Sequence, residues 1–304
     1  MYDVISIGAA TVDIFVKSNS VIDDGKFQKF AASSKNEIDS SLICSGGGGT
    51  NSSVTFARLG LNSAPLSLLG SDHLSNYILD DLKSDKISSN LLIRPKDENT
   101  DFSVIFIDNV GGRSVFTNRG TTSLTTNNVP WSKICKTKWL YITSLEGNLD
   151  LLETIIGHAF ENNIKIAINP GNREIAKPRR LLSLLKHCNY LLLNKTESET
   201  LSGHSTKTAS FWNFYLKVCP IVAITNGREG AHILTCEQHL FSPILNVKPI
   251  DETGAGDAFG SASLSALILG KDIQTALEWG IKNSASVVAH LGAKPGILTT
   301  SQIK

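Results

Sequence analysis

Residues 251–260 concentrate the side chains and glycines best suited to chemistry in this chain. They are Asp-Glu-Thr-Gly-Ala-Gly-Asp-Ala-Phe-Gly and lead into small apolar residues, a pattern that predicts a loop entering a buried helix. Because the first N–H groups of a helix attract anions, a phosphoryl group is the expected guest of Gly254, Ala255 and Gly256. Asp257 would repel that guest unless it has its own task, such as accepting the proton of an attacking hydroxyl group.

A purely structural interpretation of the same stretch stays open. Asp257 would then be an ordinary first-turn acid, which stabilises the helix dipole by less than about 1 kcal/mol. The spacing Gly254-x-Gly256-x-x-x-Gly260 also approaches a dinucleotide-binding fingerprint. That motif belongs after a first strand, so its place near the C-terminus disfavours this interpretation.

A second glycine-rich stretch, Gly-Gly-Gly-Gly-Thr-Asn over residues 46–51, precedes a short apolar helix. Taken alone it is a weak signal, because glycine runs are more often flexible loops. Together with residues 251–257, it resembles the two signatures of the ribokinase-like, phosphofructokinase-B type carbohydrate kinases, in the family's order. Similar features between the two signatures extend the resemblance over nearly the whole chain.

The resemblance implies an α/β fold, the ribokinase-like three-layer sandwich with a mostly parallel central sheet and a small β-sheet lid. It implies one kinase domain over residues 1–304, with a lid formed by about 14–42 and 98–120. The implied reaction moves the γ-phosphoryl group of ATP, with Mg²⁺, to a hydroxymethyl group of a sugar, as in ribokinases and fructokinases. An adenosine-like nucleoside kinase and a non-catalytic sugar-sensing protein of the same fold remain alternatives.

The resemblance also assigns roles to residues that match the family's motifs. Asp257 would be the catalytic base, and Gly254, Ala255 and Gly256 would form the catalytic loop around the transferring phosphoryl group. The substrate-binding residues would be Asp13, Gly47, Gly48, Asn51, Glu146 and Asp257. The nucleotide-binding residues would be Asn194, Thr225, Gly227, Gly230, Gly254, Gly256 and Asn283.

Metal ions enter the same resemblance at two places. Glu197 would hold Mg²⁺ through a water molecule, and Asp251 and Thr253 would take part in a site for a monovalent cation such as K⁺. His290 and Gly296 differ from the arginine and serine common in ribokinases proper, which weakens the inference of a monovalent cation. The histidines show no metal-ligand spacing, so no structural metal is expected.

Several of these residues have structural explanations when the resemblance is set aside. Asp13 lies in an alternating segment and would be an edge-strand acid facing water. Asn194 and Glu197 have the spacing of a helix N-cap and its capping-box partner. Glu146 would be a solvated loop acid, and Asn283 lies on a helix whose small residues explain burial without a ligand.

The elements that must position these residues alternate between strands and helices. Strands are predicted over residues 3–8, 64–69, 138–142, 164–168, 190–193 and 220–225. Helices are predicted over residues 74–85, 149–162, 258–269 and 273–290. This alternation predicts parallel crossovers and a sheet covered on both faces, with ligands at the carboxyl ends of the strands. A hairpin is predicted where residues 102–108 turn at Asn-Val-Gly-Gly over 109–112.

Composition limits the remaining classes. Lys and Arg total 29 against 28 acidic residues, so no nucleic acid partner is expected. No apolar run approaches the length of a membrane span and the N-terminus lacks a basic signal region, so we expect no membrane association and a cytoplasmic location. Five cysteines without a Cys-x-x-Cys spacing predict reduced thiols. Open edges of the predicted lid sheet favour a homodimer joined through the lid.

Overall fold

The computed structural model describes residues 1–108, 112–120 and 123–304. The predicted hairpin does form, because residues 101–107 and 113–118 pair as antiparallel strands. Three of its four predicted turn residues, 109–111, lie outside the described part of the chain.

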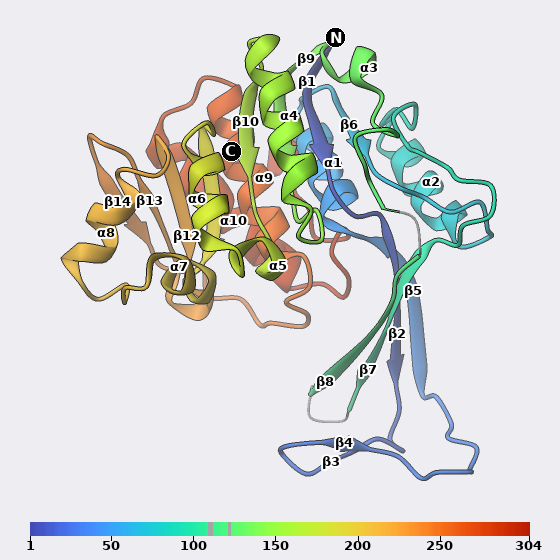
Figure 1. Ribbon diagram of the computed structural model, residues 1–304. Coiled ribbons are helices and arrows are strands. Elements are labelled where there is room, and N and C mark those ends of the chain that lie inside the picture. Colours follow the sequence, from blue (N-terminus) through green and yellow to red (C-terminus); the bar gives the residue numbers. More distant parts are fainter. Residues whose placement is uncertain (109–111, 121–122) are drawn as a thin grey trace.

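A mostly parallel sheet of eight strands forms the centre of the molecule, in the order β14-β13-β12-β11-β10-β9-β1-β6 (Figure 1). Its strands are β1 (Tyr2–Ile7), β6 (Ser63–Leu66), β9 (Thr137–Ile142), β10 (Lys165–Ile168), β11 (Tyr190–Asn194), β12 (Ile221–Thr225), β13 (Ala231–Leu234) and β14 (His239–Ser242). Strand β13 pairs antiparallel with both of its neighbours, β12 and β14, whereas the other pairings of this sheet are parallel. The six predicted parallel strands are thus confirmed to within a few residues, and the β13–β14 pair was not predicted.

Alternation along the strands builds two separate cores. In β9, Leu140 and Ile142 join the core on one face, whereas Trp139 and Tyr141 join the core on the other. Successive strand side chains point to opposite faces, so a sheet covered twice needs apolar residues at nearly every position. This requirement explains why the strands appear in the sequence as continuous apolar runs.

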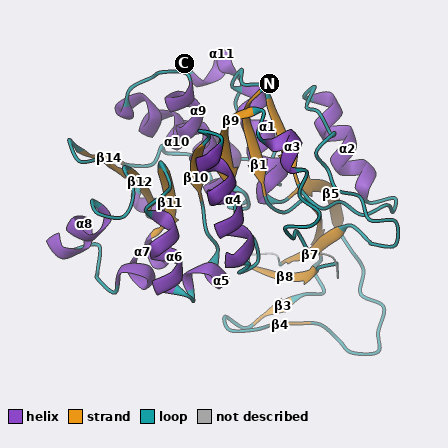
Figure 2. Cartoon of the chain, turned by 45° about the horizontal axis from the view of Figure 1, so that its top comes forward, coloured by secondary structure: helices purple, strands orange, loops and turns teal. Residues whose placement is uncertain are grey.

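Helices cover both faces and complete the three-layer sandwich. Figure 1 shows α4 and α6 in front of the sheet, with α9 and α10 behind it. The front layer contains α4 (Leu149–Glu161), α5 (Asn172–Ile175), α6 (Pro178–Leu185), α7 (Lys195–Ser202) and α8 (Ala209–Tyr215). The rear layer contains α1 (Gly48–Arg58), α9 (Ala255–Ile268), α10 (Ile273–Val288) and α11 (Thr300–Ile303). Helices α2 (Ser75–Ser84) and α3 (Trp131–Ile134) lie near the β6 end of the sheet (Figure 1 and Figure 2).

A separate small sheet projects from this body and has the order β5-β2-β7-β8 (Figure 1). Its strands are β2 (Thr11–Lys17), β5 (Ser40–Gly46), β7 (Asp101–Ile107) and β8 (Arg113–Asn118). A two-stranded ribbon of β3 (Ile22–Asp23) and β4 (Gln28–Lys29) lies at its far end. The two stretches from which a lid was predicted, residues 14–42 and 98–120, therefore both contribute to this second sheet.

Helix α9 approaches the central sheet closely because its residues are small. At Gly260, an added Cβ atom would lie 2.4 Å from both the Leu192 side chain and the Tyr141 hydroxyl group. Both neighbours are buried in the rear core, so neither can move aside at low cost. Glycine at this position thus sets the distance between α9 and the sheet.

We predict that Gly260→Ala destabilises the fold by about 1–3 kcal/mol, because overpacking forces off-rotamer side chains and backbone shifts. Gly157→Ala is the matched control, since Gly157 lies in α4 and an added Cβ there meets nothing within 4 Å. The control should gain up to about 1 kcal/mol from helix propensity. Urea unfolding of both variants measures the difference, and equal effects of the two substitutions would contradict the packing argument.

Candidate active site

The two glycine-rich stretches meet where α1 and α9 begin. Asn51 in α1 donates from Nδ2 to Oδ2 of Asp257 in the first turn of α9, over 2.9 Å. Gly254 precedes α9 with φ of 77°, and an added Cβ there would lie 2.5 Å from the Ala293 side chain. Both the left-handed backbone and the close contact require glycine at this position.

The start of α9 presents backbone donors to this junction. The N–H groups of Gly256 and Asp257 lie in the first turn, where the helix itself offers no acceptor. Ala255 N–H donates to the Glu252 carbonyl at 3.2 Å. This N–H group is therefore not available to an anion, contrary to the prediction from the sequence. Two first-turn N–H groups and the helix dipole could therefore hold an anion here, which stays a prediction.

Burial raises the pKa of the Asp257 carboxyl above its usual value, and the neighbouring charge of Asp13 adds to that shift. The Asn51 hydrogen bond and the charge of Lys294 act in the opposite direction. A carboxyl group held in this way is suited to accept a proton.

Asp13 occupies the centre of the small sheet close to its junction with the body. It lies in β2 between β5 and β7, is only 7% exposed, and accepts a hydrogen bond from Ser103 Oγ. The alternative of an edge-strand acid facing water is therefore wrong. Burial raises the pKa of Asp13, while the Ser103 hydrogen bond lowers it.

A cavity of about 260 Å³ opens at the carboxyl ends of β1 and β9. Residues 8–10, which join β1 to the strand that carries Asp13, line it together with Glu146, whereas Asp13 and Asp257 do not. Glu146 accepts from Arg119 and forms an ion pair with Arg173, whose Nη1 lies 3.0 Å from its Oε2. It is an exposed loop acid, as the structural alternative expected, and contact with a substrate stays a prediction. Gly47 and Gly48 lie at the start of α1, in contact with Ala9 and with Thr143 respectively.

Four of the seven predicted nucleotide residues lie at or just beyond the carboxyl ends of β11 and β12. Asn194 and Thr225 are register partners at the ends of these two strands, and Gly227 and Gly230 bound the turn that follows β12. Asn194 Oδ1 accepts from Glu197 N–H, and Glu197 Oε2 accepts from Asn194 N–H, both at 2.9 Å. The predicted capping box is thus confirmed. Burial raises the pKa of Glu197 despite these hydrogen bonds.

Asn283 lies in the core between α9 and the C-terminal segment. Its Nδ2 donates to the Ala258 carbonyl at 2.9 Å, and its Oδ1 accepts from Leu298 N–H at 2.9 Å. The side chain is fully buried, which fits the structural explanation given by the sequence. Contact with an adenine ring stays a prediction.

Asp251 and Thr253 form part of one tightly bonded turn before α9. Thr253 donates to Asp251 Oδ1 from its N–H at 3.0 Å and from its hydroxyl group at 2.7 Å. Arg113 of β8 binds the same oxygen. The carboxylate proposed for a monovalent cation is therefore already bonded to a guanidinium group.

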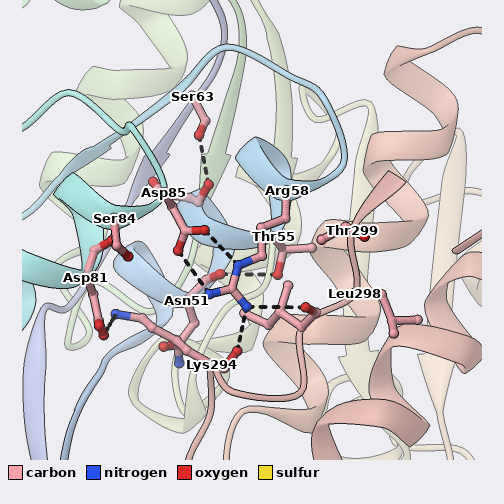
Figure 3. A network of polar contacts seen from close by, with 12 residues as sticks. Asn51, Thr55, Arg58, Ser63, Asp81, Ser84, Asp85, Lys294, Leu298 and Thr299 are labelled. Carbon is pink, nitrogen blue, oxygen red and sulfur yellow. Dashed lines mark hydrogen bonds and ion pairs between the residues drawn. The ribbon is translucent and has the colours of Figure 1, made fainter. Parts of the chain in front are cut away.

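A buried lysine next to this site was not predicted from the sequence. Lys294 is 4% exposed, binds Ser45 Oγ, and lies 3.9 Å from Asp81 Oδ2 (Figure 3). Arg58 holds the same segment by donating to the Lys294 carbonyl at 2.9 Å, while it pairs with Asp85. The network ties the small sheet, α1 and α2 to the C-terminal segment.

Comparisons with known proteins agree with this geometry. Residues 2–300 match the model of the pfkB family carbohydrate kinases. The chain belongs to this family. It is 24% identical over 261 residues to ribokinase of Bacillus subtilis, covering 85% of this chain and 86% of that protein. It is 26% identical to a nucleoside kinase of Methanocaldococcus jannaschii, covering 88% and 86% of the two chains.

Solved structures show the same fold. A structure of Arabidopsis thaliana ribokinase with ribose and ATP superposes with a TM-score of 0.80 at 17% identity, over 99% of this chain and 97% of that one. The predicted three-layer fold is confirmed. The family makes the protein a carbohydrate kinase, a phosphotransferase that uses ATP to phosphorylate a sugar or a nucleoside. No helix in the described residues is both long and apolar enough to cross a membrane.

We predict that the stability contributed by Lys294 rises with pH. Burial lowers the pKa of its ammonium group to about 8, so above that value the folded state binds fewer protons than the unfolded state. The free energy of unfolding of the parent, relative to Lys294→Met, should therefore rise by on the order of 1–3 kcal/mol between about pH 7 and pH 10. Urea unfolding at several pH values measures this difference.

Lys138→Met is the control, because Lys138 is 60% exposed and its ammonium group stays hydrated. Its difference from the parent should show no comparable rise. A flat difference for Lys294→Met as well would mean that the buried ammonium carries no penalty.

Proposed function

We propose that this kinase transfers the γ-phosphoryl group of ATP to a hydroxymethyl group of a monosaccharide, with Asp257 as the base. The observation that carries the proposal is the hydrogen bond between Asn51 and Asp257, which holds a partly buried carboxylate at the start of α9. The same turn supplies N–H groups for the phosphoryl oxygens. Base and anion site therefore occupy adjacent positions on one helix turn.

Substrate hydroxyl groups would bind between the body and the small sheet. Asp13, Asn51 and Glu146 supply the polar groups, and the small sheet acts as a lid over them. Asp257 then takes the proton of the attacking hydroxyl group, while Gly256 and Asp257 N–H groups stabilise the charge on the transferring group. Phosphoryl transfer needs this positioning and charge stabilisation more than covalent help.

The nucleotide would lie along the carboxyl ends of β11 and β12, beside Asn194, Thr225, Gly227 and Gly230. The capping box of Glu197 uses Oε2. The other carboxylate oxygen would then face a hydrated Mg²⁺ ion, for which carboxylate oxygens are suitable ligands. The ion would help to neutralise the phosphate oxygens. A parent enzyme that keeps its turnover in excess EDTA would contradict this assignment.

A monosaccharide is the first candidate, because the family model describes carbohydrate kinases and ribokinases are among the relatives. A nucleoside kinase is the second candidate, since a nucleoside kinase is among the relatives. A screen of ADP release across pentoses, hexoses, phosphosugars and nucleosides decides between them. A sugar that raises the melting temperature without stimulating ADP release would instead indicate a sensor.

We predict that Asp257→Asn lowers kcat by about 10²- to 10⁴-fold, because the amide cannot take the proton. Asp272→Asn is the matched control. Asp272 caps α10 by accepting from Thr275 N–H at 2.7 Å, and asparagine caps a helix equally well. Steady-state kinetics, with melting and ATP titration to verify folding, test the prediction. An Asp257→Asn turnover within about threefold of the parent would show that Asp257 is not the base.

We further propose a homodimer joined through the small sheet. Its exposed apolar side chains are Leu42, Ile43, Val115 and Phe116, and the adjoining ribbon region adds Ile22, Phe27, Phe30 and Ile38. An exposed apolar surface on an open sheet favours pairing with a second copy. Light scattering should show a dimer for the parent and a monomer for Val115→Lys combined with Phe116→Lys. A monomeric parent at micromolar concentration would refute the dimer.

A cytoplasmic location and the lack of a nucleic acid partner stay predictions.

A further inference from the structure

An arginine of the small sheet reaches into the turn that precedes the anion site. Arg113 at the start of β8 binds Asp251 Oδ1 through Nη1, and its Nη2 lies 3.6 Å from Glu252 Oε2. Asp251 is 4% exposed, so its charge has little access to water. A buried carboxylate of this kind needs a counter-charge close by.

Four donors surround the Asp251 carboxylate. Oδ1 accepts from Arg113 Nη1, Thr253 N–H and Thr253 Oγ1, and Oδ2 accepts from Gly292 N–H at 3.0 Å. Each carboxylate oxygen has two lone pairs, so Oδ1 is fully occupied and Oδ2 keeps one acceptor position. A cation at Asp251 would therefore have to share the carboxylate with the Arg113 guanidinium group.

The surroundings do not compensate for this occupation. An added Cβ at Gly296 would lie 2.4 Å from the Ser286 carbonyl oxygen, so no side-chain oxygen fits at that position. A guanidinium group and a second cation on one carboxylate would also repel each other. The residues around Asp251 therefore do not fit the monovalent cation that the family resemblance implies.

We propose that Arg113 supplies the positive charge at Asp251 within the chain itself, so that this kinase works without a monovalent cation. The inference rests on the proposed function, in which the turn from Asp251 to Gly256 holds the transferring phosphoryl group. Asp251 fixes that turn through Thr253 and fixes the C-terminal segment through Gly292. Arg113 belongs to the small sheet, and so the contact also joins that sheet to the anion site.

The first experiment compares turnover of the parent in potassium chloride and in choline chloride at equal ionic strength. We expect kcat and KM to agree within about twofold, because no ion site has to be filled. Melting curves in the two salts should also coincide, and they test ion binding even if no acceptor is phosphorylated. Tenfold activation of the parent by K⁺, or a K⁺-specific rise in its melting temperature, would overturn the proposal.

The second experiment removes the guanidinium group. Arg113→Ala leaves Asp251 without its counter-charge, and we expect turnover in choline chloride to fall by at least about tenfold, with a lower melting temperature. Potassium chloride should recover part of both, since an ion that binds only the folded state stabilises it. Unchanged behaviour of Arg113→Ala, or losses that no cation recovers, would each overturn the proposal.

Two further variants separate charge from folding. If Arg113→Ala does not fold, Arg113→Lys keeps a cation at the position and should respond to salts as the parent does; a K⁺-activated Arg113→Lys overturns the proposal. Lys29→Gln removes an equal charge from the β3–β4 ribbon, where Lys29 pairs with Asp24. The Lys29→Gln variant should not make turnover or melting depend on K⁺.

Absence of turnover from the parent with every acceptor and salt would count against the proposed function. The melting data would still decide whether a monovalent cation binds.

Discussion

The close approach of the first turns of α1 and α9 is the constraint on which the rest of the site depends. One hydrogen bond, from Asn51 to Asp257, joins residues 206 positions apart. It can form only because Gly254 and Gly260 let α9 lie against Ala293 and against the central sheet. Bulkier residues at either position would move the helix and with it the carboxylate and the N–H groups. Packing and chemistry therefore place the same demand on these glycines.

Burying several acids in one place creates an electrostatic cost that the fold must offset. Asp13, Asp251 and Asp257 all lie around the junction of the two sheets, where the charge of Asp251 raises the pKa of Asp13 and the charge of Asp13 raises the pKa of Asp257. Lys294 and Arg113 bring the opposing charge, one from the C-terminal segment and one from the small sheet. The charge of Lys294 acts to lower the pKa of both Asp13 and Asp257. The site is thus maintained by side chains from distant parts of the chain.

The sequence predicted those features whose cause is local. Glycine and acid spacing located both helix starts to within four residues, since α1 begins at Gly48 and α9 at Ala255. The Asn194 to Glu197 spacing predicted the capping box that the structure contains. Apolar runs located the six parallel strands. The contacts of Lys294 and Arg113 depend on residues far away in the chain, and no local pattern records them. Asp13 shows the same limit, because its strand is central only through pairing with β7, which comes much later in the sequence.

The late position of α9 and α10 in the sequence also determines when folding can be completed. Helix α1 covers part of the rear face at β1, but the rear faces of β11, β13 and β14 pack against α9 and α10, the first of which begins at residue 255. During synthesis these strands must wait, with one apolar face uncovered, until nearly the whole chain has left the ribosome. Long-range pairing of this kind slows folding and exposes intermediates to aggregation. Chains truncated before residue 255 would therefore be natural clients of chaperones, even though every strand of the central sheet is already present in them.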